Sequence, residues 1–348
     1  MNRRGLFRTR SEGAGLMHQV LGRLSDRDRL IVRLLYRHRV LTTQQVCAAA
    51  FPSVRRAEMR MRDLHEIRVV DRFRPLVATG SAPYHWVLDE VGAYVAAWEC
   101  GLDLAKSGWR RDRALSVAAS PQLGHLLGVN SFFIALMREA RERPGRRLAE
   151  WLSSAQCAAV HDSLYSGRIR PDGYAVWAEG GVRLPFFVEY DCGTERLERL
   201  RDKLRGYDTL VQWMDKWPDQ YGEDGGRPYA RLVLFVFRTA GRELEARRAF
   251  GDPPVCVATA VIPEGAECNP AAETVWSPAV PGTARRLRLV ELATRQAWQP
   301  GVPVAPPDEP RRRRHIDHPA DAALAAYFGE DDDHPAAAGA GSGETEAW

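Results

Sequence analysis

Residues 168–207, RIRPDGYAVWAEGGVRLPFFVEYDCGTERLERLRDKLRGY, decide the fold of this chain. Two runs rich in aromatic and β-branched residues, 169–178 and 182–191, flank the pair Gly180-Gly181. Such a pair predicts a two-residue hairpin loop, because both central residues of a type I′ turn need a positive φ. The stretch therefore predicts two antiparallel strands joined by a tight turn.

The length of this turn fixes which residues face each other. With the two glycines as the loop, Asp172 lies opposite Glu189 and Arg170 lies opposite Asp191. Side chains alternate between the two faces of a strand, so these four charged residues share one face. Opposed carboxylates, about 5 Å apart at Cβ, repel each other and are stabilised by a cation, a shared proton or a basic neighbour. The alternative is ordinary Pro-Asp-Gly turn chemistry with solvated carboxylates.

Three short motifs in and after the hairpin resemble the actinobacterial replication-relaxation family of plasmid and mobile-element proteins. They are RPDG at 170–173, FVEYDCGTE at 187–195, and Lys203-Leu204 followed by Tyr207. The resemblance covers roughly residues 24–237. It implies a core similar to the PD-(D/E)XK nuclease fold, in which an Asp and a Glu on successive strands bind Mg²⁺.

Carried over by position, Asp172 and Glu189 are the catalytic acids and the Mg²⁺ ligands that the resemblance implies. Active members of that fold usually place a Lys two residues after the second acid, where this chain has Asp191. We keep Asp191 as a catalytic candidate and add Lys203, one of only three lysines in the chain. Lysine presents a compact ammonium or loses its proton when desolvated, which arginine does not do. The alternative for Lys203 is a solvated surface residue.

The first hundred residues predict a winged helix-turn-helix. Ser25 with Asp28, and Thr42 with Gln45, are capping boxes that open two helices. A third helix follows from apolar residues at three- and four-residue intervals. We expect helices at 25–38, 42–50 and 53–69, wing strands at 69–76 and 84–88, and a helix from Asp89 to about residue 98.

Basic residues concentrate on the early part of the expected third helix, which in a winged helix enters the major groove. The candidate DNA contacts are Arg55, Arg56, Arg60 and Arg62. Guanidinium groups there can bind phosphates or guanine edges. A winged helix used only for protein contacts is the alternative.

The second half of the chain predicts an α+β domain in the order αβββαβ. A helix begins at Ser120-Pro121 and carries His125 and Asn130, which the resemblance makes weak site candidates. The alternative for His125 is a packed or capping residue. Arg170, opposite Asp191 in the hairpin, is a further weak candidate. The remaining elements are a strand at 147–152, the hairpin, a helix at 194–217, a buried strand at 230–237, a helix at 242–250 and an edge strand at 255–262.

Length and composition limit the number of domains and the class of protein. A chain of 348 residues with 45% hydrophobic content predicts two domains and a tail. The expected division is a basic arm at 1–23, a winged helix-turn-helix at 24–100, a linker at 101–119, a nuclease-like domain at 120–295 and a disordered tail at 296–348. No apolar run is long enough to span a bilayer, so we expect no membrane partner and a cytoplasmic location. Six scattered cysteines without a C-x-x-C pair argue against a zinc ribbon.

These observations predict a DNA-binding protein of plasmid or mobile-element replication. The expected partners are double-stranded DNA and other replication or mobilisation proteins, with the nuclease-like domain as a DNA-binding accessory. The alternative is an active Mg²⁺-dependent endonuclease that uses Asp172 and Glu189. No tyrosine relaxase motif or His cluster occurs, which argues against nicking through a covalent tyrosyl intermediate.

Overall fold

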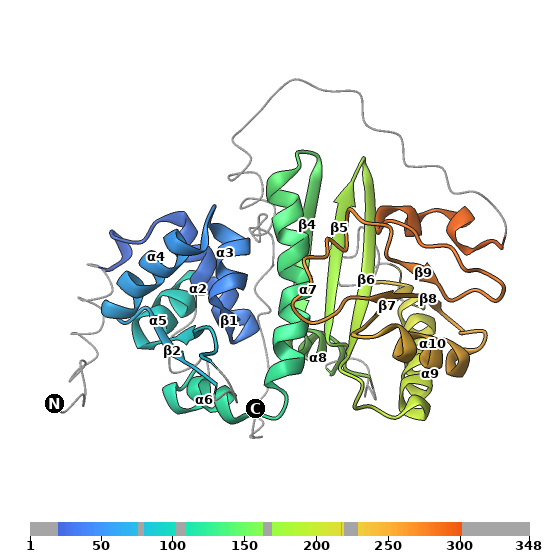
Figure 1. Ribbon diagram of the computed structural model, residues 1–348, viewed down its shortest axis with the longest axis horizontal. Helices are drawn as coiled ribbons and strands as arrows, with labels where there is room; N and C mark the ends of the chain where they lie inside the picture. Colours follow the sequence, from blue (N-terminus) through green and yellow to red (C-terminus); the bar gives the residue numbers. More distant parts are fainter. Residues whose placement is uncertain are drawn as a thin grey trace. The chain divides into compact units, whose positions relative to one another are not determined.

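A computed structural model describes residues 20–75, 80–101, 109–162, 169–216, 218 and 229–300. These residues divide into two compact units, the first ending at Leu123 and the second beginning at Gly124 (Figure 1). Most of the expected basic arm, and residues 301–348 of the expected tail, lie outside the described residues. None of the described helices combines the length and the apolar character needed to cross a membrane.

The first unit packs its helices against a small sheet of order β1-β3-β2. Both predicted capping boxes form, at Ser25 with Asp28 and at Thr42 with Gln45, and each begins a helix as expected. The helices are α2 Asp26–His38, α3 Thr43–Ala50, α4 Val54–Glu66 and α5 Glu90–Glu99; the strands are β1 Leu41–Thr42, β2 Val70–Phe73 and β3 His85–Leu88.

The expected linker at 101–119 contains helical structure over residues 111–119. The short helix α6, Arg111–Ser116, continues into the 3-10 helix Val117–Ala119. Arg111 forms ion pairs with Asp71 and Asp89, which belong to the first unit, and Val117 is buried. These ion pairs join residues that are far apart in the sequence, and they hold the segment in place. The sequence did not predict the helix, because helical periodicity is hard to detect over so few residues.

The second unit is built on a six-stranded sheet in which the strands lie in sequence order. Strands β4, β5 and β6 form an antiparallel meander, β6, β7 and β8 run parallel, and β9 pairs antiparallel with β8. The strands are β4 Arg146–Ser153, β5 Gly173–Glu179, β6 Val182–Asp191, β7 Leu232–Phe237, β8 Cys256–Val261 and β9 Ser277–Pro278.

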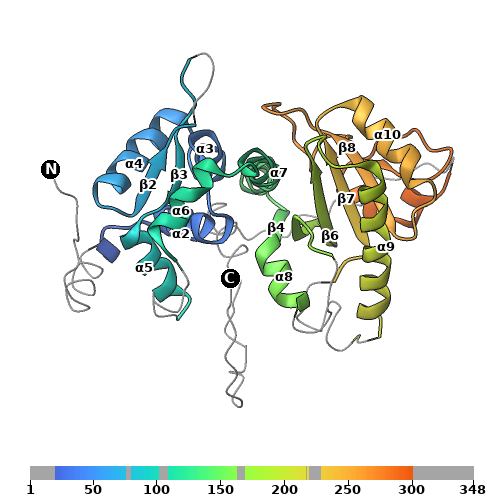
Figure 2. The same cartoon turned by 90° about the horizontal axis from the view of Figure 1, so that it is seen from below.

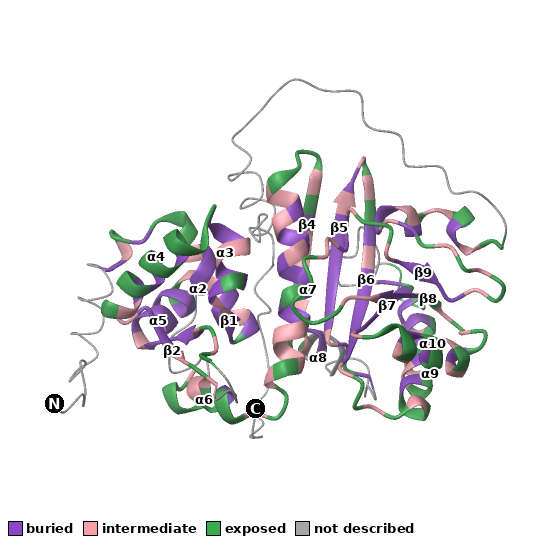
Figure 3. Ribbon diagram, in the orientation of Figure 1, coloured by how far each residue is buried: buried purple, intermediate pink, exposed green. Residues whose placement is uncertain are grey.

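Helices cover both faces of this sheet. Figure 2 shows α7, Leu123–Glu142, on one side, and α9, Leu197–Met214, with α10, Ala240–Phe250, on the other. On the α7 side, the ring of Phe133 stacks on Trp151 of β4. All six residues of β7 are buried, as its continuous apolar run predicted (Figure 3).

Three features of this unit differ from the sequence expectation. Helix α8, Ser154–Asp162, was not predicted, and its apolar residues show no clear helical periodicity. Strand β8 is internal, because β9 and not β8 forms the edge of the sheet. After the 3-10 helix Val290–Ala293, a second one, Arg295–Trp298, runs past the expected start of the tail at residue 296, and Ala297 is buried.

Candidate functional site

The β5–β6 hairpin has the predicted register. Gly180 and Gly181 have φ values of 61° and 79°, as a type I′ turn requires. The ladder pairs Gly173 with Val188. One residue further out, the backbone N–H of Asp172 donates to the carbonyl of Val188 at 3.1 Å. Asp172 therefore lies immediately before β5, at the register position opposite Glu189 on β6.

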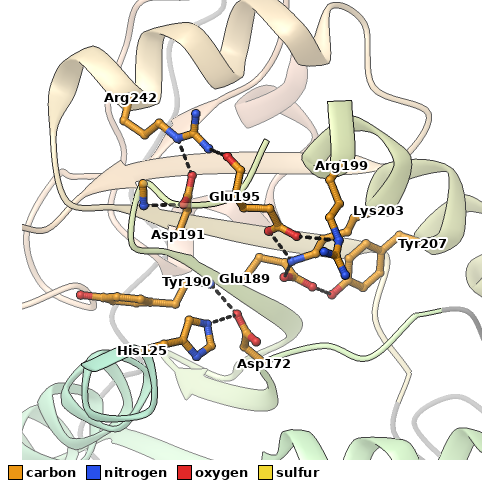
Figure 4. Close-up of polar contacts among 11 residues, drawn as sticks. His125, Asp172, Glu189, Tyr190, Asp191, Glu195, Arg199, Lys203, Tyr207 and Arg242 are labelled. Carbon is orange, nitrogen blue, oxygen red and sulfur yellow. Dashed lines mark hydrogen bonds and ion pairs between the residues drawn. The ribbon is translucent and has the colours of Figure 1, made fainter. Parts of the chain in front are cut away.

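Glu189 is buried against helix α9, and both of its carboxylate oxygens have partners (Figure 4). The hydroxyl of Tyr207 donates to Oε1 at 2.5 Å, and the ammonium of Lys203 donates to Oε2 at 2.8 Å. Lys203 also donates to Glu195 at 2.8 Å. Positions 203 and 207 are four residues apart, so both side chains leave the same face of the helix.

Burial and neighbouring charges set the protonation of this cluster. Burial raises the pKa of Glu189 to about 7, and the charge of Asp172 acts in the same direction. Burial also raises the pKa of Tyr207 well above its usual range, so the phenol stays protonated and donates. Burial lowers the pKa of Lys203, but the Glu189 charge outweighs this and the net shift is upward. Glu189 therefore titrates near neutral pH between a phenol and an ammonium ion.

Whereas Glu189 contacts helix α9, Asp172 contacts helix α7. Its Oδ2 accepts the backbone N–H of Tyr190 at 2.9 Å and lies 2.9 Å from Nε2 of His125. Burial lowers the pKa of His125, but the hydrogen bond and charge of Asp172 outweigh this effect, so the pKa is raised. His125 thus donates to Asp172 most strongly as an imidazolium.

A glycine allows α7 to approach closely enough for this contact. A Cβ built on Gly128 would lie 2.3 Å from Cε1 of the Tyr190 ring. The imidazole of His125 meets the same ring edge-on, with centroids 6.0 Å apart. The absence of a side chain at Gly128 therefore lets His125 lie beside Asp172.

Asp191 occupies the position where the PD-(D/E)XK pattern usually has Lys, and both of its carboxylate oxygens contact protein groups. Its Oδ2 pairs with Nε of Arg242 at 2.6 Å, and its Oδ1 accepts the backbone N–H of Gly193 at 2.6 Å. Arg242 also donates to the carbonyl of Glu195. Asp191 thus links β6 to α10 as a buried ion pair, a structural role that the sequence did not predict.

The structure brings some predicted site residues together and separates others. Asp172, Glu189, Lys203 and His125 converge, whereas Asn130 is buried within α7 and Arg170 is exposed before β5. The sequence motif contained Tyr207, but its contact with Glu189 was not predicted. Arg242 was missed altogether, because it follows Asp191 by 51 residues and no local pattern links them.

The carboxylates do not form a ready metal site. Among the described residues, no group of three or more His, Cys, Asp or Glu side chains is placed to hold a metal ion. Mg²⁺ prefers octahedral oxygen coordination, usually with one or two carboxylates and several waters. Both oxygens of Glu189 already accept hydrogen bonds from protein groups. In this arrangement Mg²⁺ would have to compete with Tyr207 and Lys203 for the oxygens of Glu189.

The arginines of α4 in the first unit differ among themselves. Arg55, Arg56 and Arg62 are exposed. Arg60 instead donates to Asp28 from Nε at 2.9 Å and from a terminal nitrogen at 2.6 Å. Asp28 is fully buried on α2, so Arg60 neutralises an internal charge, a role that the sequence did not predict.

Comparison with known proteins gives one family. No curated protein and no solved structure matches the chain significantly. The family model described as replication-relaxation matches residues 32–223, which include most of the first unit, the hairpin with Asp172 and Glu189, and the helix with Lys203 and Tyr207. On this match, which spans more than half of its length, the chain belongs to the replication-relaxation family.

Proposed function

We propose that this protein binds duplex DNA in the replication or relaxation of plasmids or other mobile elements, and that its second unit is a DNA-binding accessory that does not cut. Family membership supports a role in replication or relaxation. The expected partners are double-stranded DNA and other replication or mobilisation proteins.

The element order of the first unit supports a winged helix-turn-helix. Helices α2, α3 and α4 precede the β2–β3 hairpin, and the short strand β1 completes the sheet. In a winged helix, the third helix docks in the major groove with its early residues near the bases. That helix is α4 here, so its stretch from Arg55 to Arg62 is the proposed groove contact.

The exposed arginines of α4 carry this proposal. Within the part of the chain that the structure describes, Arg55, Arg56 and Arg62 have no carboxylate within ion-pair distance. Three unpaired guanidinium groups on one short helix favour an anionic partner, and DNA phosphates and guanine edges match their planar donor geometry.

The second unit supports a nuclease-like core that has lost its metal chemistry. The order α7, β4, β5, β6, α9, β7 matches the αβββαβ pattern, apart from the added α8. Asp172 and Glu189 are the residues that the resemblance assigns to the acids of that fold. Each oxygen of Glu189 already accepts a hydrogen bond from a protein group, and Asp191 stands where the pattern usually has Lys. An accessory role needs neither a bound metal nor a free carboxylate.

One observation favours the alternative, a Mg²⁺-dependent endonuclease. The Lys203 ammonium lies 2.8 Å from Glu189, so α9 supplies a lysine to the acids that the strand itself lacks. Cutting would require Glu189 to release Tyr207 or Lys203 and accept a metal in their place. This cost is why the accessory role is the better supported one.

Two assays on the full chain test the proposal. Duplex binding is measured by fluorescence anisotropy, and cleavage by incubation of supercoiled plasmid with MgCl₂ or MnCl₂, for the wild type, Asp172→Asn and Glu189→Gln. We expect duplex binding by all three proteins and no nicking. Metal-dependent nicking that both substitutions abolish would establish the endonuclease instead. Failure of the wild type to bind duplex at low salt would overturn the DNA-binding proposal.

A further inference from the structure

The β2–β3 hairpin of the first unit stacks two arginines on one tyrosine. The guanidinium carbon of Arg74 lies 3.7 Å from the ring centroid of Tyr84, and that of Arg72 lies 4.2 Å from the same centroid. Arg72 also lies 5.8 Å from the ring of Trp86, and Arg74 donates to the hydroxyl of Ser81 at 3.0 Å. Two like charges are therefore held together on a half-buried ring.

No acidic side chain balances this pair. The sequence from Arg72 to Tyr84 contains no Asp or Glu. The adjacent Asp71 forms an ion pair with Arg111, and it contacts Arg72 only through the backbone N–H of that residue. Across the residues that the structure describes, neither guanidinium has a carboxylate within ion-pair distance.

Several other arginines of this unit are treated differently by the fold. Arg29 and Arg33 share Glu99, and Arg68 contacts Asp89 and Glu90. The unit thus has acids that pair with arginines elsewhere. At the hairpin, an approaching anion would relieve the repulsion between two like charges.

The stacked geometry suits a phosphate ligand. A guanidinium carries its five N–H donors in its own plane, so contact between its face and a ring leaves the donors at its edge available. Arg74 uses one of them on Ser81, and the others can bind a ligand. The ring also restricts the rotamers of both side chains, which lowers the entropy that binding would cost. Phosphate oxygens accept bidentate hydrogen bonds from this kind of donor.

We propose that Arg72 and Arg74 form a second DNA contact of the first unit, which binds backbone phosphates of the duplex, and that Tyr84 is the positioning residue for both. The inference rests on the proposed DNA binding and adds to it a site outside α4. Tyr84 carries no charge, so its contribution to DNA affinity can be separated from the attraction between the arginines and the phosphates.

The test compares charge removal with loss of the ring. Binding of the full chain to a 30-base-pair duplex, a length of about three helical turns, is followed by anisotropy over a KCl series. Arg72→Gln with Arg74→Gln should lower the slope of log K against log salt by about 1.8, because two phosphate contacts are lost. Tyr84→Leu should weaken binding about fivefold or more with a nearly unchanged slope, since the charges remain but their stacking is lost. Tyr84→Phe should bind like the wild type.

The matched control removes two charges from another exposed site of the same unit. Arg110→Gln with Arg113→Gln changes net charge equally, and it should leave the slope close to that of the wild type. The α4 variant for comparison is Arg55→Ala, Arg56→Ala, Arg62→Ala. If this variant loses affinity but the hairpin variant behaves like the control, the hairpin inference fails and the proposed function stands. If the wild type binds no duplex, the proposed function fails.

Two further measurements test whether each variant is folded and which kind of ligand binds. Thermal melts establish that each variant is folded, and Tyr84→Phe keeps the ring if Tyr84→Leu does not fold. A Tyr84→Phe variant with wild-type affinity beside a weakened hairpin variant supports the contact. Polyglutamate that competes as well as duplex at equal charge concentration would assign the surface to an acidic protein and overturn the DNA assignment.

Discussion

Helix α4 of the first unit and the cluster around Glu189 in the second unit both concentrate charge, but they balance it differently. On α4, Arg55, Arg56 and Arg62 are exposed, and no described carboxylate pairs with them. In the cluster, Glu189 is buried, and Tyr207 and Lys203 each donate to one of its oxygens. Charge that the fold already balances serves stability first, whereas unbalanced charge at the surface is available to a ligand.

The same distinction divides a single helix. Arg60 lies on α4 with the exposed arginines, yet it pairs with the buried Asp28 of α2. Its hydrogen bonds raise the pKa of its guanidinium, mainly through Asp28. Position on a helix is therefore a weaker guide to function than the partner of each guanidinium, and the following variants test that distinction.

The largest effect is expected at Arg242. Arg242→Met leaves the buried carboxylate of Asp191 without its cation, and breaking a buried ion pair typically costs about 3–5 kcal/mol. The free energy of unfolding from urea titration measures this cost. The exposed Arg248 on the same helix is the control, and Arg248→Met should change stability by less than about 0.5 kcal/mol. Equal effects of the two substitutions would show that Asp191 is not anchored as described.

Glu189 should give the second effect, in the pH dependence of stability. The folded protein holds a proton on Glu189 up to about pH 7, whereas a carboxyl with the usual pKa of 4.5 loses it earlier. Stability contributed by this proton is present at low pH and is lost as pH rises from 4.5 through 7, by at most about 1.4 kcal/mol per pH unit. Glu189→Gln should remove that fall.

Urea titrations at pH 5, 6, 7 and 8, values that span the pKa of about 7 for Glu189, measure this difference. The exposed Glu198 on α9 provides the control, and Glu198→Gln should keep the wild-type pH profile. A Glu189→Gln profile parallel to that of the wild type would mean that Glu189 is ionised throughout, with Lys203 as its full counterion.

Two sets of arginine variants on α4 should separate binding from stability. Arg55→Ala, Arg56→Ala, Arg62→Ala should weaken duplex binding by about tenfold or more, a loss of about 1.4 kcal/mol, and lower the salt slope by up to about 2.7. Its melting temperature should stay close to that of the wild type. Arg60→Ala should lower the melting temperature and keep the salt slope. The reverse pattern would place the DNA contact at Arg60.

The smallest effect concerns His125. Asp172→Asn removes the negative charge that raises the pKa of the imidazole, while the amide oxygen can still accept the N–H of Tyr190. The pKa of His125, followed by NMR, should fall in this variant. Asp202→Asn, at an exposed site on α9, should leave it unchanged. An unaltered His125 pKa in Asp172→Asn would mean that another group sets it.

Local rules explain most of what the sequence predicted. The Gly180-Gly181 loop fixed the register of β5 and β6, and the capping boxes fixed the starts of α2 and α3. These signals act over two to four residues, so no tertiary information is needed to use them. The opposition of Asp172 and Glu189 follows from the same count.

The partners of the charged side chains were decided only by tertiary structure. Arg60 meets Asp28 from 32 residues away, and Arg242 meets Asp191 from 51 residues away. Helix α9 begins later than predicted, at Leu197, which places Lys203 within reach of Glu189. Helix packing determines which distant groups share a buried space, and hydrophobic periodicity states only which face is buried. The sequence by itself therefore determined the hairpin, its two acids and the helix starts, while packing decided which charges are neutralised within the fold.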